Sequence, residues 1–169
     1  MRMTRRCLAL LATLCGSVCA YADEPQSLSA KVDGASFVSD DHSILLVPLP
    51  NTFTLKAATA GASSYPPPKT PIDHLSITCD AFTAGQTMKW VSKDFASNAC
   101  FAHFEKGSAN SGPSVDEYTI DKDNPDTLFE ITAAHGKVIE GRFQFHMKNA
   151  AGKTLTIEDG HFVAQDRQL

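Results

Sequence analysis

The chain has 169 residues, of which 43% are hydrophobic, and its 15 basic and 19 acidic side chains give a net charge of −4. This length predicts one domain with a core large enough to fold alone. The acidic balance argues against a nucleic-acid-binding surface and against docking on an anionic membrane, because both need clustered Lys and Arg.

Residues 1–22 have the features of a secretory signal peptide. Three arginines stand within the first six residues, an apolar stretch follows, and Ala20-Tyr21-Ala22 gives the small-x-small pattern of a cleavage site. The apolar stretch is short for a membrane-spanning helix. Cleavage would leave residues 23–169, with twelve basic and nineteen acidic side chains and a net charge of −7. We therefore expect a periplasmic or secreted protein, exported as in Gram-negative bacteria, with no transmembrane segment in the mature chain.

The mature chain alternates between apolar and polar residues with a period of two, which is typical of half-buried antiparallel strands. Asp33-Gly34 predicts a two-residue hairpin, Gly141 suggests a bulge, and Asp159-Gly160 predicts a bend before the last strand. The pattern predicts strands over residues 28–32, 35–38, 44–47, 53–57, 75–79, 100–104, 129–132, 138–147, 154–158 and 161–165.

Other segments interrupt this alternation. Residues 61–71 contain Tyr65 and three consecutive prolines, which an internal strand cannot accommodate because proline has no N–H to donate. Residues 106–114 are rich in Gly and Ser, and residues 93–99 suit a single helical turn. We expect two loops on the surface of one domain rather than domain boundaries, because alternation resumes on both sides.

Cys79 and Cys100 are the two cysteines that follow the leader. Two cysteines in an oxidising compartment predict one disulfide, whereas a metal site would favour a close Cys-x-x-Cys spacing. The sequence therefore predicts an all-β fold: a single antiparallel β-sandwich or flattened barrel of about eight to ten short strands with one disulfide.

Both ends of the mature chain carry turn-and-core motifs of the forms V-(D/N)-G-x-x-(F/W) and G-x-F-x-F … GK-x-(L/V)-x-I-x-(D/N)-G-x-F. With these motifs the chain resembles a family of small exported bacterial β-sandwich domains of unknown function. The resemblance covers about a third of the mature chain, and the middle part departs from it. It implies the fold and export, and it brings no catalytic residues. The motifs are Val32-Asp33-Gly34-Ala35-Ser36-Phe37, Gly141-Arg142-Phe143-Gln144-Phe145 and Gly152-Lys153-Thr154-Leu155-Thr156-Ile157-Glu158-Asp159-Gly160-His161-Phe162.

The six histidines show no close paired spacing such as His-x-His. His103 and Glu105 are two residues apart and would share one face of a strand. A metal site needs three or four converging ligands, so we interpret the histidines as surface residues and assign no metal and no cofactor. His146 and His161 would approach each other only if their strands were neighbours. The carboxylates at residues 121–126 lack the glycine of a calcium loop and suit a solvated turn.

The sequence favours a protein without catalytic activity, and it leaves an enzyme as an open alternative. It has no G-x-S-x-G motif, and the predicted disulfide uses both remaining cysteines. Glu130 and Glu140 would be candidate glycosidase carboxylates only if they faced each other across a hairpin.

We expect an exported, non-catalytic binding protein, such as an inhibitor or immunity-type protein that binds another protein of the cell envelope. The expected contact residues are Tyr65 and Pro67 on a constrained loop, Trp90, His103 and Glu105. Trp90 has two interpretations, a cover over the core or an exposed contact. One alternative is a small envelope hydrolase or metal-dependent enzyme, which requires His103, Glu105 and one further histidine to converge in a cleft. Another alternative is a carrier that holds a small molecule between the sheets.

Overall fold

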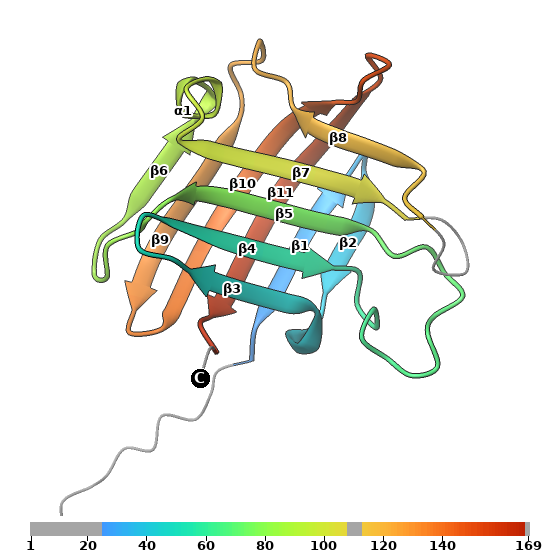
Figure 1. The fold of residues 1–169 in the computed structure, drawn as a ribbon, viewed down its shortest axis with the longest axis horizontal. Coiled ribbons are helices and arrows are strands. Elements are labelled where there is room, and N and C mark those ends of the chain that lie inside the picture. Colours follow the sequence, from blue (N-terminus) through green and yellow to red (C-terminus); the bar gives the residue numbers. More distant parts are fainter. Residues whose placement is uncertain (1–24, 108–112, 168–169) are drawn as a thin grey trace, which may run out of the picture.

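The computed structural model describes residues 25–107 and 113–167, and these residues form one antiparallel sheet that is nearly closed into a barrel (Figure 1). This confirms the predicted all-β class. The described residues contain eleven strands: β1 (Ser27–Val32), β2 (Ala35–Ser39), β3 (Ile44–Pro48), β4 (Thr52–Ala58), β5 (His74–Asp80), β6 (Met88–Val91), β7 (Cys100–Lys106), β8 (Asp116–Ile120), β9 (Leu128–His135), β10 (Val138–Lys148) and β11 (Thr154–Gln165). Two short helices join them: the 3₁₀ turn η1 (Asp41–Ser43) and α1 (Ser92–Ala96).

The sheet folds over into two layers. Strands β3, β4, β5, β7 and β8 form the front layer in Figure 1, and β2, β1, β11, β10, β9 and β6 lie behind it. The layers join where the end of β10 leaves β9 and pairs instead with β8, through Met147 opposite Ile120. On the opposite side, the Ala60 N–H donates to the Val38 carbonyl at 2.7 Å, which draws the β2 edge toward the end of β4.

Alternation creates the core, because each strand turns one face toward the other layer. Phe129 from β9 stacks on Phe162 from β11 with ring centroids 5.3 Å apart, and it also contacts Phe53 of the front layer at 6.0 Å. The cross-layer ring contacts fill the space between the layers with aromatic side chains. Trp90 of β6 belongs to the same cluster and is 5% exposed.

The last strand differs from the sequence prediction. Asp159-Gly160 does not separate two strands, because β11 runs continuously from Thr154 to Gln165. Asp159 has φ 51°, and the pairing of β11 with both neighbours shifts register there. The pair therefore forms a β-bulge inside one strand. A register shift between Glu140 and Gly141 confirms the predicted irregularity in β10.

Hydrogen bonds made by the side chains of Gln26 and Arg167, together called the polar clasp, protect the free edge of β3. Gln26 is 4% exposed, and its side-chain amide donates to the carbonyls of Asp41 and Ile44 at 3.1 and 3.2 Å. Pro48 at the other end of β3 offers no N–H. Arg167 binds both carboxylate oxygens of Asp41 at 2.7 and 2.8 Å. These hydrogen bonds from Arg167 hold the pKa of Asp41 below its ordinary value.

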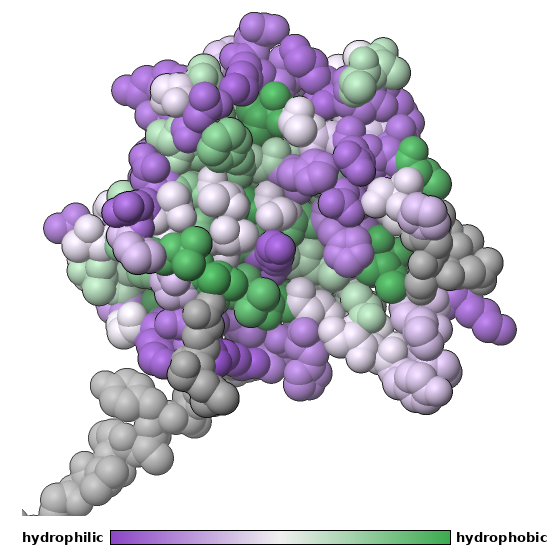
Figure 2. Space-filling model, viewed as in Figure 1, coloured by the Kyte–Doolittle hydropathy of each residue, from purple (hydrophilic) through white to green (hydrophobic). Residues whose placement is uncertain are grey.

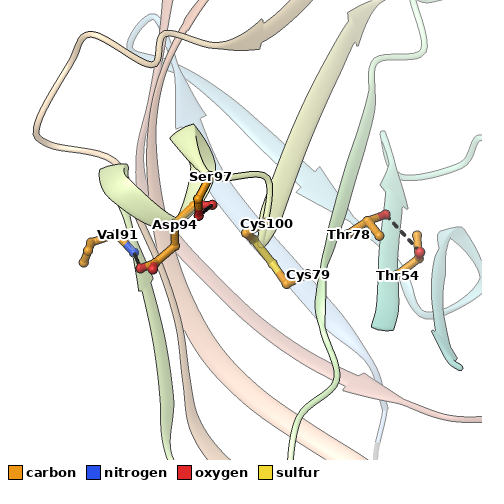
Figure 3. Close-up of a disulfide and its surroundings, with 7 residues drawn as sticks. All are labelled: Thr54, Thr78, Cys79, Val91, Asp94, Ser97 and Cys100. Atoms are coloured by element: carbon orange, nitrogen blue, oxygen red, sulfur yellow. Dashed lines mark hydrogen bonds between the residues drawn. A yellow bond between two sulfur atoms is a disulfide. The ribbon is translucent and has the colours of Figure 1, made fainter. Parts of the chain in front are cut away.

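The predicted disulfide joins Cys79 of β5 to Cys100 of β7, and both residues are buried (Figure 3). The two cysteines are directly opposite in the β5–β7 ladder. The segment between them contains β6 and α1, which agrees with the predicted helical turn. The Asp94 carboxylate accepts a hydrogen bond from the Val91 N–H at 2.9 Å at the start of α1.

Strands β6 and β8 were not among the predicted strands, because β6 has four residues and β8 only two buried side chains. The predicted signal peptide, residues 1–22, lies outside the described residues. Within the described residues, no helix has the length and apolar character needed to cross a membrane.

Candidate functional site

The outer face of the front layer carries a row of polar side chains at matched positions. Alternate residues of β4, β5 and β7 point outward, and the ladder places Lys56 opposite Ser76 and Ser76 opposite His103. The next row on the same face places His74 opposite Glu105. Two residues that are far apart in the sequence, His74 and Glu105, are therefore direct cross-strand neighbours.

His103 lies between two carboxylates. Its Nδ1 is 3.7 Å from Oε1 of Glu105, and its Nε2 is 3.9 Å from Oε2 of Glu117 on β8. The hydroxyl of Ser114 donates to the other Glu105 oxygen, Oε2, at 3.0 Å. Both ring nitrogens of His103 therefore face carboxylates.

These side chains border a hollow of about 400 Å³ on the protein surface. This volume is within the range of small-ligand sites, although the hollow is shallow enough to leave His103 and Glu105 each about one third exposed. Figure 2 shows this face, with hydrophilic side chains gathered over the right-hand parts of β5 and β7 and hydrophobic ones along β3. The polar lining consists of Ser43, Lys56, His74, Ser76, His103 and Glu105.

The loop that joins β4 to β5, residues 59–73, rises from one end of this hollow. Its base is held by hydrogen bonds: the Asp73 N–H donates to Thr59 Oγ1 at 2.9 Å, and the Gly61 N–H donates to Asp40 Oδ2 at 2.6 Å. The bond from Gly61 keeps the pKa of Asp40 below its ordinary value. Tyr65 near the loop tip is 96% exposed, and Pro67 is exposed as well.

Trp90 lies in the core. Its ring contacts Phe53 at 5.8 Å and Phe129 at 5.7 Å between centroids. Of the two interpretations of this residue, the structure therefore places it as a core side chain, and it offers no exposed contact surface. Of the predicted contact residues, Tyr65 and Pro67 therefore lie on the loop, His103 and Glu105 lie near its base, and Trp90 lies in the core.

The other candidate groups are not brought together as ligands. His146 and His161 are on neighbouring strands, but their partners in the ladder are Thr156 and Arg142 respectively. Lys148 engages the acidic turn, with its Nζ 2.7 Å from Asp121.

Glu130 pairs with Arg142 at 2.6 Å. It is not opposite Glu140, whose ladder partner on β9 is Ala133. The carboxylates of this outer face of the back layer therefore do not form the facing pair that a glycosidase needs.

Sequence reasoning missed His74, Ser114 and Glu117. His74 stands alone in its strand, so periodicity gives it no partner. In the part of the chain that the structure describes, no three His, Cys, Asp or Glu side chains stand as a formed metal-binding group. His74 and His103 nevertheless line the same hollow as Glu105.

Comparison with protein-family models, curated protein sequences and solved structures gives no match to this chain. The resemblance of the terminal motifs therefore stays a prediction.

Proposed function

We propose that the protein is an exported, non-catalytic binding protein that recognises another protein of the cell envelope, as an inhibitor or immunity-type protein does. The observation that supports this proposal is the exposure of Tyr65, an aromatic side chain that is 96% exposed near the tip of a loop whose base is held by hydrogen bonds. Exposed large aromatic groups on constrained loops lose little conformational entropy on docking and are frequent interface anchors.

The surroundings of Tyr65 support a contact surface with a polar component. The hollow at the base of the loop presents Lys56, His74 and Glu105, which could pair with polar groups at the rim of a partner. Leu45 on β3 is 48% exposed on the same face and adds apolar area. We propose that Tyr65 anchors the partner and that the hollow supplies orientation.

Site-specific photo-crosslinking tests this proposal. A benzophenone amino acid at position 65 should give a discrete crosslinked product with an envelope protein in the native host. The same amino acid at position 29, exposed on β1 in the back layer, is the control. No product at position 65, or the same product at both positions, would refute the proposed docking surface.

Tyr65→Ala should then weaken binding of the captured partner by tenfold or more, about 1.4 kcal/mol, as for an interface anchor. Tyr65→Phe should retain most of the affinity, because it keeps the ring. Neither change should alter folding, since the side chain is exposed. If both variants lost the same amount of binding affinity, the contribution would come from the hydroxyl group instead of the ring.

A second candidate, a small metal-dependent hydrolase, is favoured by the presence of His74, His103 and Glu105 in one hollow. It requires a bound metal ion, which can be tested directly. The carrier alternative has less support, because rings from both layers occupy the space between the sheets.

A further inference from the structure

The outer face of β5 and β7 holds side chains of the types that bind transition metals. His103 and Glu105 are two residues apart on β7 and point outward together, and His74 on β5 is the ladder partner of Glu105. We propose that His74, His103 and Glu105 bind one divalent transition-metal ion of the Zn²⁺ class. Two imidazoles and one carboxylate form a donor set that zinc accepts, with a fourth position left open.

The distances are close to those that coordination needs. Two ligands at about 2.0–2.1 Å from a tetrahedral zinc ion are about 3.4 Å from each other. Nδ1 of His103 and Oε1 of Glu105 are already 3.7 Å apart. A movement of a few tenths of an ångström therefore allows both to reach one ion. Ser114 holds the other Glu105 oxygen, which leaves Oε1 directed toward the ion.

Glu117 supplies the outer carboxylate that zinc-bound histidines commonly have. It lies beside Nε2 of His103 at 3.9 Å, on the side of the ring away from Glu105. A proton on Nε2 that points to Glu117 leaves Nδ1 free to donate its lone pair to the metal. The negative charges of Glu105 and Glu117 together balance a divalent cation.

His74 completes the set by rotation of its side chain. It does not form a ready ligand group in its present conformation. It is exposed, so a change of rotamer meets little packing resistance, and its Cβ is about 5 Å from that of Glu105. Lys56 also lines the hollow and opposes a cation there, but its backbone is separated from that of His103 by the whole of β5, about 10 Å across two strand spacings. Its side chain is long and exposed, so its ammonium group can extend into solvent away from the ion.

The fourth coordination position would face the hollow. A water molecule or a side chain from outside could occupy it. This metal site does not depend on the proposed partner, and the partner test at position 65 needs no metal. Failure of one proposal is therefore distinguishable from failure of the other.

Equilibrium dialysis of untagged, EDTA-stripped mature protein against Zn²⁺ tests the site. We expect about one zinc ion per chain at micromolar free zinc. His74→Ala, His103→Ala and Glu105→Gln should each lower the affinity by tenfold or more. Glu117→Gln should lower it by about tenfold through the orientation of His103. His146→Ala and His161→Ala, on the other layer, should have no effect.

Thermal unfolding with and without Zn²⁺ is the second measurement, because zinc should raise the unfolding midpoint of wild type and of His146→Ala by more than that of His74→Ala. All the substituted side chains are at the surface, so the metal-free variants should unfold near the wild-type temperature. Absence of stoichiometric zinc at micromolar concentration would overturn the proposal. Equal loss of zinc in His146→Ala and His74→Ala would overturn it too, since binding would then not involve this set specifically.

Discussion

A reciprocal pairing of glycine and phenylalanine between β10 and β11 gives the sharpest prediction about stability. Gly141 is opposite Phe162 and Phe143 is opposite Gly160, so each ring lies over the glycine of the other strand. A Cβ added to Gly160 would be 2.5 Å from Cδ2 of Phe143. A Cβ on Gly141 would be 2.6 Å from Cζ of Phe162 and would also overlap the Glu130 carbonyl oxygen.

The expected cost follows from these distances. Carbon atoms pack best at about 3.5–4.0 Å, so Gly160→Ala must push the Phe143 ring away by roughly 1 Å. That ring stacks on Phe145 at 5.3 Å between centroids, so its displacement disturbs the core. We expect Gly160→Ala to lower the free energy of unfolding by about 1–3 kcal/mol. Gly141→Ala should cost more, because the Glu130 carbonyl belongs to the β9–β10 ladder and moves less easily.

Urea denaturation followed by the fluorescence of Trp90, the only tryptophan in the chain, measures the effect. Ser36→Ala on the exposed face of β2 is the control and should change stability by less than about 0.5 kcal/mol. A double-mutant cycle separates the ring contact from other causes. Gly160→Ala combined with Phe143→Leu should be more stable than the sum of the single effects predicts. Strict additivity, or a Gly160→Ala variant as stable as wild type, would refute the reasoning.

Two further changes probe the cross-link and the polar clasp. Cys79→Ala/Cys100→Ala opens a loop with a sequence separation of 21, and the chain-entropy relation predicts a loss of about 3 kcal/mol in the free energy of unfolding. A loss below about 1 kcal/mol in urea denaturation would contradict this. Asp41 has a lowered pKa because it accepts hydrogen bonds from Arg167. Its stabilising contribution is present above the ordinary Asp pKa of about 4 and is lost as the pH falls through the lower folded-state value. Asp41→Asn should therefore show less loss of stability on acidification than wild type, in acid titrations followed by Trp90 fluorescence, and identical acid profiles would count against the clasp.

The fold was accessible from the sequence where side-chain alternation and turn residues agreed. In β10, Phe143, Phe145 and Met147 are buried while the residues between them are not, as the period of two requires. The prediction failed at Asp159-Gly160 because the same residue types form both turns and bulges. Only the pairing of β11 with strands on both sides distinguishes the two cases.

The terminal motifs acquire a physical meaning in the structure. The segments Gly141-x-Phe143 and Gly160-x-Phe162 run antiparallel in neighbouring strands, so each glycine makes room for the ring opposite. A sequence pattern of this kind reports packing between two strands and not chemistry. This explains why the resemblance at the chain ends implies a fold without implying an active site.

Only part of the candidate site could be predicted from the sequence. Alternation tells which face of a sheet a residue lies on, but it does not tell which residue lies beside it on the next strand. The spacing of two between His103 and Glu105 placed them together, whereas nothing in the local pattern connected His74 to them. Glu117 was missed for a further reason, since β8 itself was not predicted. Trp90 shows the converse limit: its residue type favours an interface, but its strand position places it in the core.

The disulfide defines the register of β5 against β7, which side-chain alternation does not give. Cysteines that are directly opposite in an antiparallel pair fix the partner of every other residue in both strands. Counting three residues back from Cys79 and three forward from Cys100 pairs Ser76 with His103, and counting five pairs His74 with Glu105. The cross-link that stabilises the front layer therefore also sets the relative position of the proposed metal ligands. A slip of one residue would turn the β5 side chain opposite each ligand to the other face of the sheet, so His74 and Glu105 would no longer share a face.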